Sequence, residues 1–93
     1  MMRNGRQTPP YNNALHTYKI RVEQAEIQKS NMNLANEIHE KTLLKLKEGV
    51  GSTLEISQAE TELKAAQINY INALYDLVIA KIDYYNSIGK TIK

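Results

Sequence analysis

The sequence predicts an all-α protein, an antiparallel two-helix coiled-coil hairpin. Both prolines lie in the first ten residues, and beyond them glycine occurs only at Gly49, Gly51 and Gly89. Two long stretches therefore contain no helix breaker, and both are rich in the helix formers Ala, Leu, Glu, Gln and Lys. The second stretch also repeats apolar residues with alternating three- and four-residue spacing, which is the period of a coiled coil.

Length and composition exclude several classes of protein. The chain has 93 residues, six Tyr, no Phe or Trp and 42% apolar residues, which indicates one domain and argues against a β-sandwich or an α/β enzyme. The absence of Cys excludes disulfide scaffolds, thiolate zinc sites and thiol catalysis. No apolar run approaches the length of a membrane span, so we expect no direct membrane insertion by this segment.

Charge argues against nucleic acid as a partner. The formal net charge is +2, but four of the twelve basic residues lie near the ends, at Arg3, Arg6, Lys90 and Lys93. The body between them holds eight basic and ten acidic residues, a net charge of −2. That balance lacks the basic surface that phosphate backbones require.

The first helix is expected over residues 10–48, after a tail at 1–9. Thr8 is suited to cap its N-terminus, with Pro9 in the first turn. At the other end, Lys45 and Lys47 complement the helix dipole and Gly49 suits a left-handed C-terminal cap.

A turn at 49–52 leads into a second helix, expected over residues 53–88. Ser52 and Glu55 have the spacing of a capping box, and Gly89 is expected to end the helix before a tail at 90–93. The connection is too short for anything but an antiparallel pair, so the hairpin spans 10–89 with helices of about 55–60 Å.

The second helix carries a regular seam. Large residues alternate with small ones for nearly five seven-residue repeats, which predicts left-handed coiled-coil packing. The seam consists of Ile56, Ala59, Leu63, Ala66, Tyr70, Ala73, Leu77, Ala80, Tyr84 and Ser87.

A second apolar stripe lies on roughly the opposite face of this helix and requires a second neighbour. Two alternatives follow: a four-helix bundle formed by dimerisation, which the pattern alone favours, and a larger ring of helices. The stripe consists of Ile68, Ile71, Tyr75, Val78, Ile82 and Tyr85.

The first helix has a less regular seam, which Lys29, Asn36 and His39 interrupt. Its expected members are Tyr11, Leu15, Tyr18, Val22, Ala25, Met32, Leu43 and Leu46. A partial second stripe consists of Ile20, Ile27, Leu34 and Ile38.

No set of residues suited to catalysis is evident. A di-iron bundle needs Glu three residues before His, whereas Asn13 and Asn36 precede His16 and His39. The turn Gly49-Val50-Gly51-Ser52 lacks the lysine and the preceding strand of a phosphate loop. We therefore expect no enzyme activity, no catalytic residue, no cofactor and no metal site.

One segment goes beyond a generic coiled coil. The run Leu46-Lys47-Glu48-Gly49-Val50-Gly51-Ser52-Thr53-Leu54-Glu55-Ile56-Ser57-Gln58-Ala59-Glu60-Thr61-Glu62-Leu63 resembles the hairpin tip of the TolC-like outer-membrane efflux proteins. The following Ala66-Gln67-Ile68-Asn69-Tyr70-Ile71-Asn72-Ala73-Leu74-Tyr75-Asp76 resembles the returning helix of that family, and the resemblance covers about residues 11–89.

The resemblance implies a trimeric duct whose helices cross the periplasm from an outer-membrane barrel and whose tips meet a periplasmic adaptor protein. Glu55 matches an acidic position that narrows the pore in some members, while Gln58 stands at the second such position and Gly51 at a position that is basic in some members. The adaptor-docking tip would comprise Glu48, Gly49, Val50, Gly51, Ser52, Thr53 and Leu54.

The chain differs from the family in having no signal peptide, no barrel strands and one hairpin where the family has two. We therefore expect a fragment of an efflux protein, located in the periplasm at the outer membrane, that self-associates as a dimer or another oligomer when isolated. The alternative is a stand-alone soluble coiled-coil scaffold that dimerises into a four-helix bundle.

Overall fold

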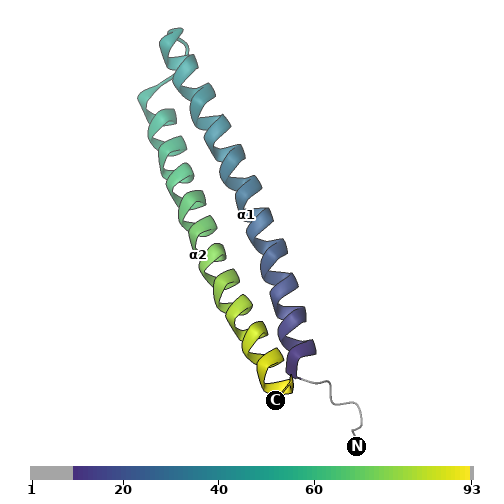
Figure 1. The fold of residues 1–93 in the computed structure, drawn as a ribbon. Helices are drawn as coiled ribbons and strands as arrows, with labels where there is room; N and C mark the ends of the chain where they lie inside the picture. Colours follow the sequence, from purple (N-terminus) through teal and green to yellow (C-terminus); the bar gives the residue numbers. More distant parts are fainter. Residues whose placement is uncertain (1–9, 93) are drawn as a thin grey trace, which may run out of the picture.

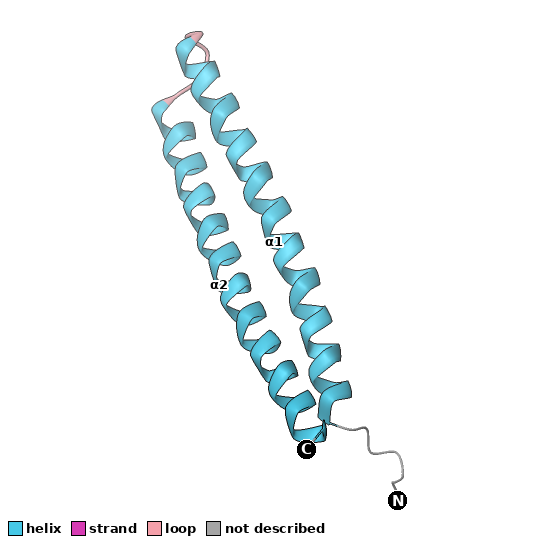
Figure 2. Ribbon diagram, viewed as in Figure 1, coloured by secondary structure: helices cyan, strands magenta, loops and turns pink. Residues whose placement is uncertain are grey.

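The protein is a long helical hairpin in the computed structural model, which describes the backbone of residues 10–92 and the side chains of residues 12–89. Helix α1 spans Pro10–Lys47 and helix α2 spans Thr53–Ile92. They run antiparallel and side by side, with the turn at one end and the outer ends of both helices at the other (Figure 1). The described part contains only helix and loop (Figure 2) and measures 67 × 27 × 14 Å, so the predicted all-α hairpin is confirmed.

Most of the helix boundaries agree with the prediction. α2 begins at Thr53 as expected, and α1 ends at Lys47, one residue before the expected end. The proposed cap at Thr8 and Pro9 and most of the proposed tails lie outside the described residues.

The prediction that Gly89 ends the second helix is wrong, because α2 continues through it to Ile92. Among residues 10–92, Gly49 is the only one with a positive φ, so Gly89 keeps the helical backbone. A glycine inside a helix costs about 1 kcal/mol relative to alanine, which is too little to end a helix where nothing turns the chain away.

The predicted seam of α2 is confirmed at every position. All ten of its residues are buried or half-buried, while every other residue from Thr53 to Gly89 except the half-buried Ile88 is exposed. Ala59, Ala73 and Ala80 are the most buried of the ten. Because alanine has a short side chain, α1 can approach α2 closely along this line.

The seam of α1 differs from the prediction toward the turn. Lys29 and Asn36 do not interrupt it, since both are exposed, whereas His39 does lie on it. Leu43 directly follows the seam position Thr42 and is exposed. Leu46 is also exposed, because it lies nearer the turn than the level of Ile56, the first seam residue of α2. The side chains that face α2 are Ala14, Leu15, Tyr18, Arg21, Val22, Ala25, Gln28, Met32, Ala35, His39 and Thr42.

The core is thin. The buried apolar residues among those described are four alanines, and no side chain is fully buried. Thr42 can be buried because its hydroxyl donates a hydrogen bond to the Ile38 carbonyl at 2.7 Å. Toward the open end, the rings of Tyr18 and Tyr84 stack with their centroids 6.0 Å apart and 3° between their planes. The hairpin therefore depends on close helix contact rather than on bulky side chains.

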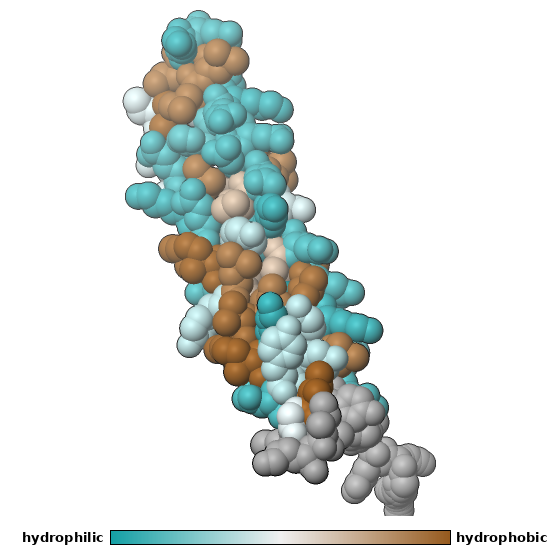
Figure 3. Space-filling model, viewed as in Figure 1, coloured by the Kyte–Doolittle hydropathy of each residue, from teal (hydrophilic) through white to brown (hydrophobic). Residues whose placement is uncertain are grey.

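The second stripe of α2 is exposed along its whole length. Its six residues, Ile68 to Tyr85, are between 52% and 67% exposed. Figure 3 shows apolar side chains along the α2 edge in the half of the hairpin away from the turn. This chain alone therefore leaves the stripe without the neighbour that its pattern requires.

A leucine in place of a buried seam alanine should force the two helices apart. We expect Ala73→Leu to lower the free energy of unfolding by about 1–3 kcal/mol, because a tight contact has no room for three extra carbons. Ala65→Leu, at an exposed position of the same helix, should change it by less than about 0.5 kcal/mol. Urea unfolding followed by circular dichroism at one protein concentration measures both. Equal effects would contradict close packing at Ala73.

Candidate functional site

The turn ends α1 with a fixed hydrogen-bond pattern. The N–H of Gly49 donates to the Leu46 carbonyl, and the N–H of Val50 donates to the Lys45 carbonyl, each at 3.0 Å. Gly49 has a φ of 85°, which side chains on an L-residue disfavour. Together these features form a Schellman motif, so the predicted left-handed cap at Gly49 is confirmed.

Gly51 has a different role from Gly49. Its N–H donates to the Lys45 carbonyl at 3.1 Å, so the chain folds back over the last turn of α1. A Cβ at this position would lie 2.8 Å from the backbone nitrogen of Leu46, whereas a Cβ at Gly49 would meet nothing within 4 Å. The sequence places Gly51 in the turn and in the proposed docking tip but does not predict this close approach, because it depends on where α1 ends.

The start of α2 is held by the predicted capping box. The N–H of Glu55 donates to Ser52 Oγ at 3.2 Å, and the N–H of Ser52 donates to Glu55 Oε1 at 3.3 Å. The other carboxylate oxygen of Glu55 lies 3.5 Å from Lys45 Nζ. Glu55 therefore links the last turn of α1 to the first turn of α2.

The proposed docking tip is almost entirely accessible. Of residues 48–54, only Gly51 is half-buried and the rest are exposed. Val50 is 71% exposed and Leu54 66%, although both are apolar. Figure 3 shows apolar side chains near the turn. We call the exposed apolar residues of this end the tip surface, namely Leu43, Leu44, Leu46, Val50 and Leu54.

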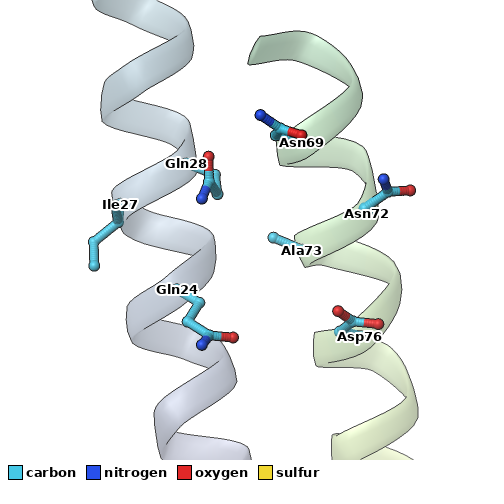
Figure 4. A pocket seen from close by; sticks show the side chains of 7 residues that line it. All are labelled: Gln24, Ile27, Gln28, Asn69, Asn72, Ala73 and Asp76. Carbon is cyan, nitrogen blue, oxygen red and sulfur yellow. The ribbon is translucent and has the colours of Figure 1, made fainter. Parts of the chain in front are cut away.

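Shallow grooves follow one face of the hairpin between the helices. One of them holds about 290 Å³, and in Figure 4 Gln24 and Gln28 reach from α1 toward α2 while Ala73 points back toward α1. Polar groups from α2 line these grooves every seven residues. We call this side the grooved face, marked by Glu55, Glu62, Asn69, Asp76 and Asp83. This row has the same seven-residue repeat as the α2 seam, so the sequence contains the pattern, although it was not among the predictions.

Glu55 and Gln58, the two positions proposed for a pore constriction, both lie in the groove nearest the turn. That groove is also lined by Ile38, Thr42 and Lys45. Both Glu55 oxygens already contact neighbours, namely the Ser52 N–H and the Lys45 ammonium. The structure thus brings the two residues to one face of the tip, where the carboxylate also has a structural role.

His39 is a half-buried ionisable residue of the seam, and its side chain is 18% exposed. Its Nε2 is buried, makes no hydrogen bond and lies 3.7 Å from a carboxylate oxygen of Glu60. That distance is too long for a hydrogen bond. Within the described residues, no three His, Asp or Glu side chains come together as metal ligands would.

Neither α1 nor α2, over the residues described, has the length and apolar character that crossing a bilayer requires. Compared with family models, with curated proteins and with solved structures, the chain gives no match.

Removing the cap should weaken the turn. We expect Ser52→Ala to lower the free energy of unfolding by about 1 kcal/mol, because the Glu55 N–H loses its acceptor. Glu55→Gln keeps an oxygen for the Ser52 N–H and loses only the exposed ion pair with Lys45, so it should cost less than about 0.5 kcal/mol. Urea unfolding of the two variants separates these contributions. A larger loss for Glu55→Gln would mean that the ion pair, and not the cap, holds the turn.

Proposed function

We propose that this hairpin forms part of the periplasmic helical duct of a TolC-like outer-membrane efflux protein, with its tip docking a periplasmic adaptor. The role is passive: the duct conducts small molecules and the tip joins it to a pump. The proposal rests on the resemblance of residues 46–63 to the tip of that family. The observation that carries it is an exposed apolar surface at a turn held by backbone hydrogen bonds and a capping box.

The tip surface supports docking because its shape is fixed before any partner binds. The end of α1 and the start of α2 are both capped, and the lack of a Cβ at Gly51 lets the turn lie close against α1. Exposed Val50 and Leu54 therefore occupy defined places at the end of a rod 67 Å long. Apolar anchors on a preorganised surface lose little conformational entropy on binding, which favours a stable contact.

The sides of the hairpin support a place in a duct wall. A helix in such a wall needs a neighbour on each side and a polar surface toward the water inside. The grooved face supplies polar residues at a regular repeat, and Glu55 and Gln58 stand at its tip end, where a constriction would lie. A ring of carboxylates at that place would favour cations.

The stand-alone scaffold is the second candidate, and the exposed stripe of α2 favours it. Six large apolar residues on one helix face can pair with the same face of another copy. Such a scaffold would form a stable oligomer and would show no preference for an efflux adaptor.

Fractionation of the source cells distinguishes the two candidates. An antibody against residues 40–63 should detect the protein in the outer-membrane fraction, in a band several-fold heavier than 10.6 kDa, if the hairpin belongs to a duct. A band near 10.6 kDa in the soluble fraction would contradict the duct and support the scaffold.

A charge on the tip should disrupt docking. We expect Val50→Asp to weaken binding to an efflux adaptor by roughly tenfold or more, which corresponds to about 1.4 kcal/mol. Stability should change by less than about 0.5 kcal/mol, because Val50 is exposed. Asn33→Ala, at an exposed position in the middle of α1, serves as the control. Titration with labelled adaptor measures the affinity of both variants. Equal affinities of the Val50→Asp and Asn33→Ala proteins would show that the tip is not part of the contact.

The two turn glycines provide a second test of the tip. Gly51→Ala must displace the turn from Leu46, whereas Gly49→Ala meets open space and acquires only backbone strain. We expect both variants to keep their helicity and Gly51→Ala to lose more adaptor affinity. Circular dichroism and the same titration check this, and unchanged binding by both would contradict docking through the turn.

A further inference from the structure

Two apolar surfaces remain uncovered on the sides of the hairpin. The first, the α2 strip, is the exposed stripe already described, and its central residue Tyr75 is 67% exposed. The second, the α1 strip, repeats every seven residues and consists of Ile20, Ile27 and Leu34, which are 37%, 56% and 56% exposed. The two helices cover neither strip, and each strip is an apolar line of a length suited to another helix.

The strips lie on different edges of the hairpin. The α2 strip follows heptad positions opposite the seam, and therefore faces away from α1. The α1 strip borders the grooved face, where Ile27 lines a groove beside Gln24 and Gln28 and projects away from α2 in Figure 4. One partner helix therefore cannot cover both strips at once.

The strips lie at the same height along the rod. Three contacts between the helices set the register, namely Tyr18 with Tyr84, His39 with Glu60 and Lys45 with Glu55, and the residue numbers of each pair add up to about 100. Ile27 is accordingly level with a position close to Tyr75. Two hairpins that stand side by side with their tips in the same direction would thus bring an α1 strip against an α2 strip.

We infer that the α2 strip of one copy packs against the α1 strip of a second copy, in a side-by-side contact that repeats from copy to copy. Each copy then offers one strip to each neighbour, so the interface is heterologous and can close into a ring. This inference goes beyond the proposed duct, in which the resemblance implies two unlike hairpins in each subunit. Here copies of a single hairpin supply both sides of the contact.

Charges beside the strips favour this pairing. Lys64 and Lys81 lie three or four residues from α2 strip members, and Glu23 and Glu37 lie three or four residues from α1 strip members, so each borders its strip on the helix surface. In the inferred contact Lys64 is level with Glu37, and Lys81 lies about one turn from Glu23.

A symmetric contact between two α2 strips lacks this complementarity. It would place the lysines of both copies along the contact without acidic partners. The acidic residues of α2 between residues 68 and 85, Asp76 and Asp83, lie on the grooved face instead. It would also leave the α1 strip of both copies exposed to water. The heterologous contact avoids both costs.

Cross-linking tests the contact directly, since the chain has no cysteine of its own. Ile27→Cys and Tyr75→Cys proteins, carrying tags of different size, are mixed and treated with a short bis-maleimide. We expect the mixed product to dominate over both homodimers. Glu26→Cys, next to Ile27 but about 100° around the helix, is the matched control and should give little product with Tyr75→Cys.

Each other outcome overturns the inference. A dominant Tyr75→Cys homodimer would indicate the symmetric four-helix bundle, and absence of product from all pairs would indicate that copies do not meet through these strips. Equal product from the Glu26→Cys control would indicate random collision.

Sedimentation measures the association itself. We expect Ile27→Glu to weaken it by roughly tenfold or more, since the variant places a carboxylate in the apolar contact, while Glu26→Gln leaves it unchanged. Equal association of the two variants would contradict the α1 strip as an interface. No adaptor is present in these measurements, so loss of adaptor docking would refute the proposed function and leave this inference standing.

Discussion

The close contact of α1 and α2 through alanine is the constraint on which the rest of the structure depends. Ala25, Ala59, Ala73 and Ala80 are the buried apolar residues among those described, and their short side chains let two helices lie together over almost their full length. The same choice limits how much apolar surface the pair can bury. Large side chains such as Ile71, Tyr75 and Val78 therefore remain on the outside, where only further helices can cover them.

The two ends of the hairpin are stabilised by different interactions. Away from the turn, the stacked rings of Tyr18 and Tyr84 join the helices through an apolar contact. At the turn, backbone hydrogen bonds, the capping box and the ion pair between Lys45 and Glu55 do so instead. Because polar and backbone interactions fix the turn, its apolar side chains Val50 and Leu54 are left free to face a partner.

The surfaces of the molecule match the separate tasks of the proposed duct. An apolar tip at the end of a rigid rod is suited to docking, and a polar grooved face is suited to contact with water. The α1 and α2 strips on the two edges are suited to lateral contact with neighbouring helices. A free-standing four-helix bundle would explain one strip, whereas lateral packing explains both together with the charges that border them.

The sequence alone determined the features that depend on local chemistry. Both helices, the cap at Gly49, the capping box of Ser52 and Glu55, and the whole α2 seam could be predicted, because each requires only neighbours in the chain or a strict repeat of side-chain size. Tertiary structure alone decided which residues of α1 face α2, since small and polar side chains such as Ala35 and Thr42 are acceptable opposite alanine and the larger Leu43 lies out of phase. It also decided the close approach at Gly51 and the exposure of Leu46, because both depend on where one helix ends against the other.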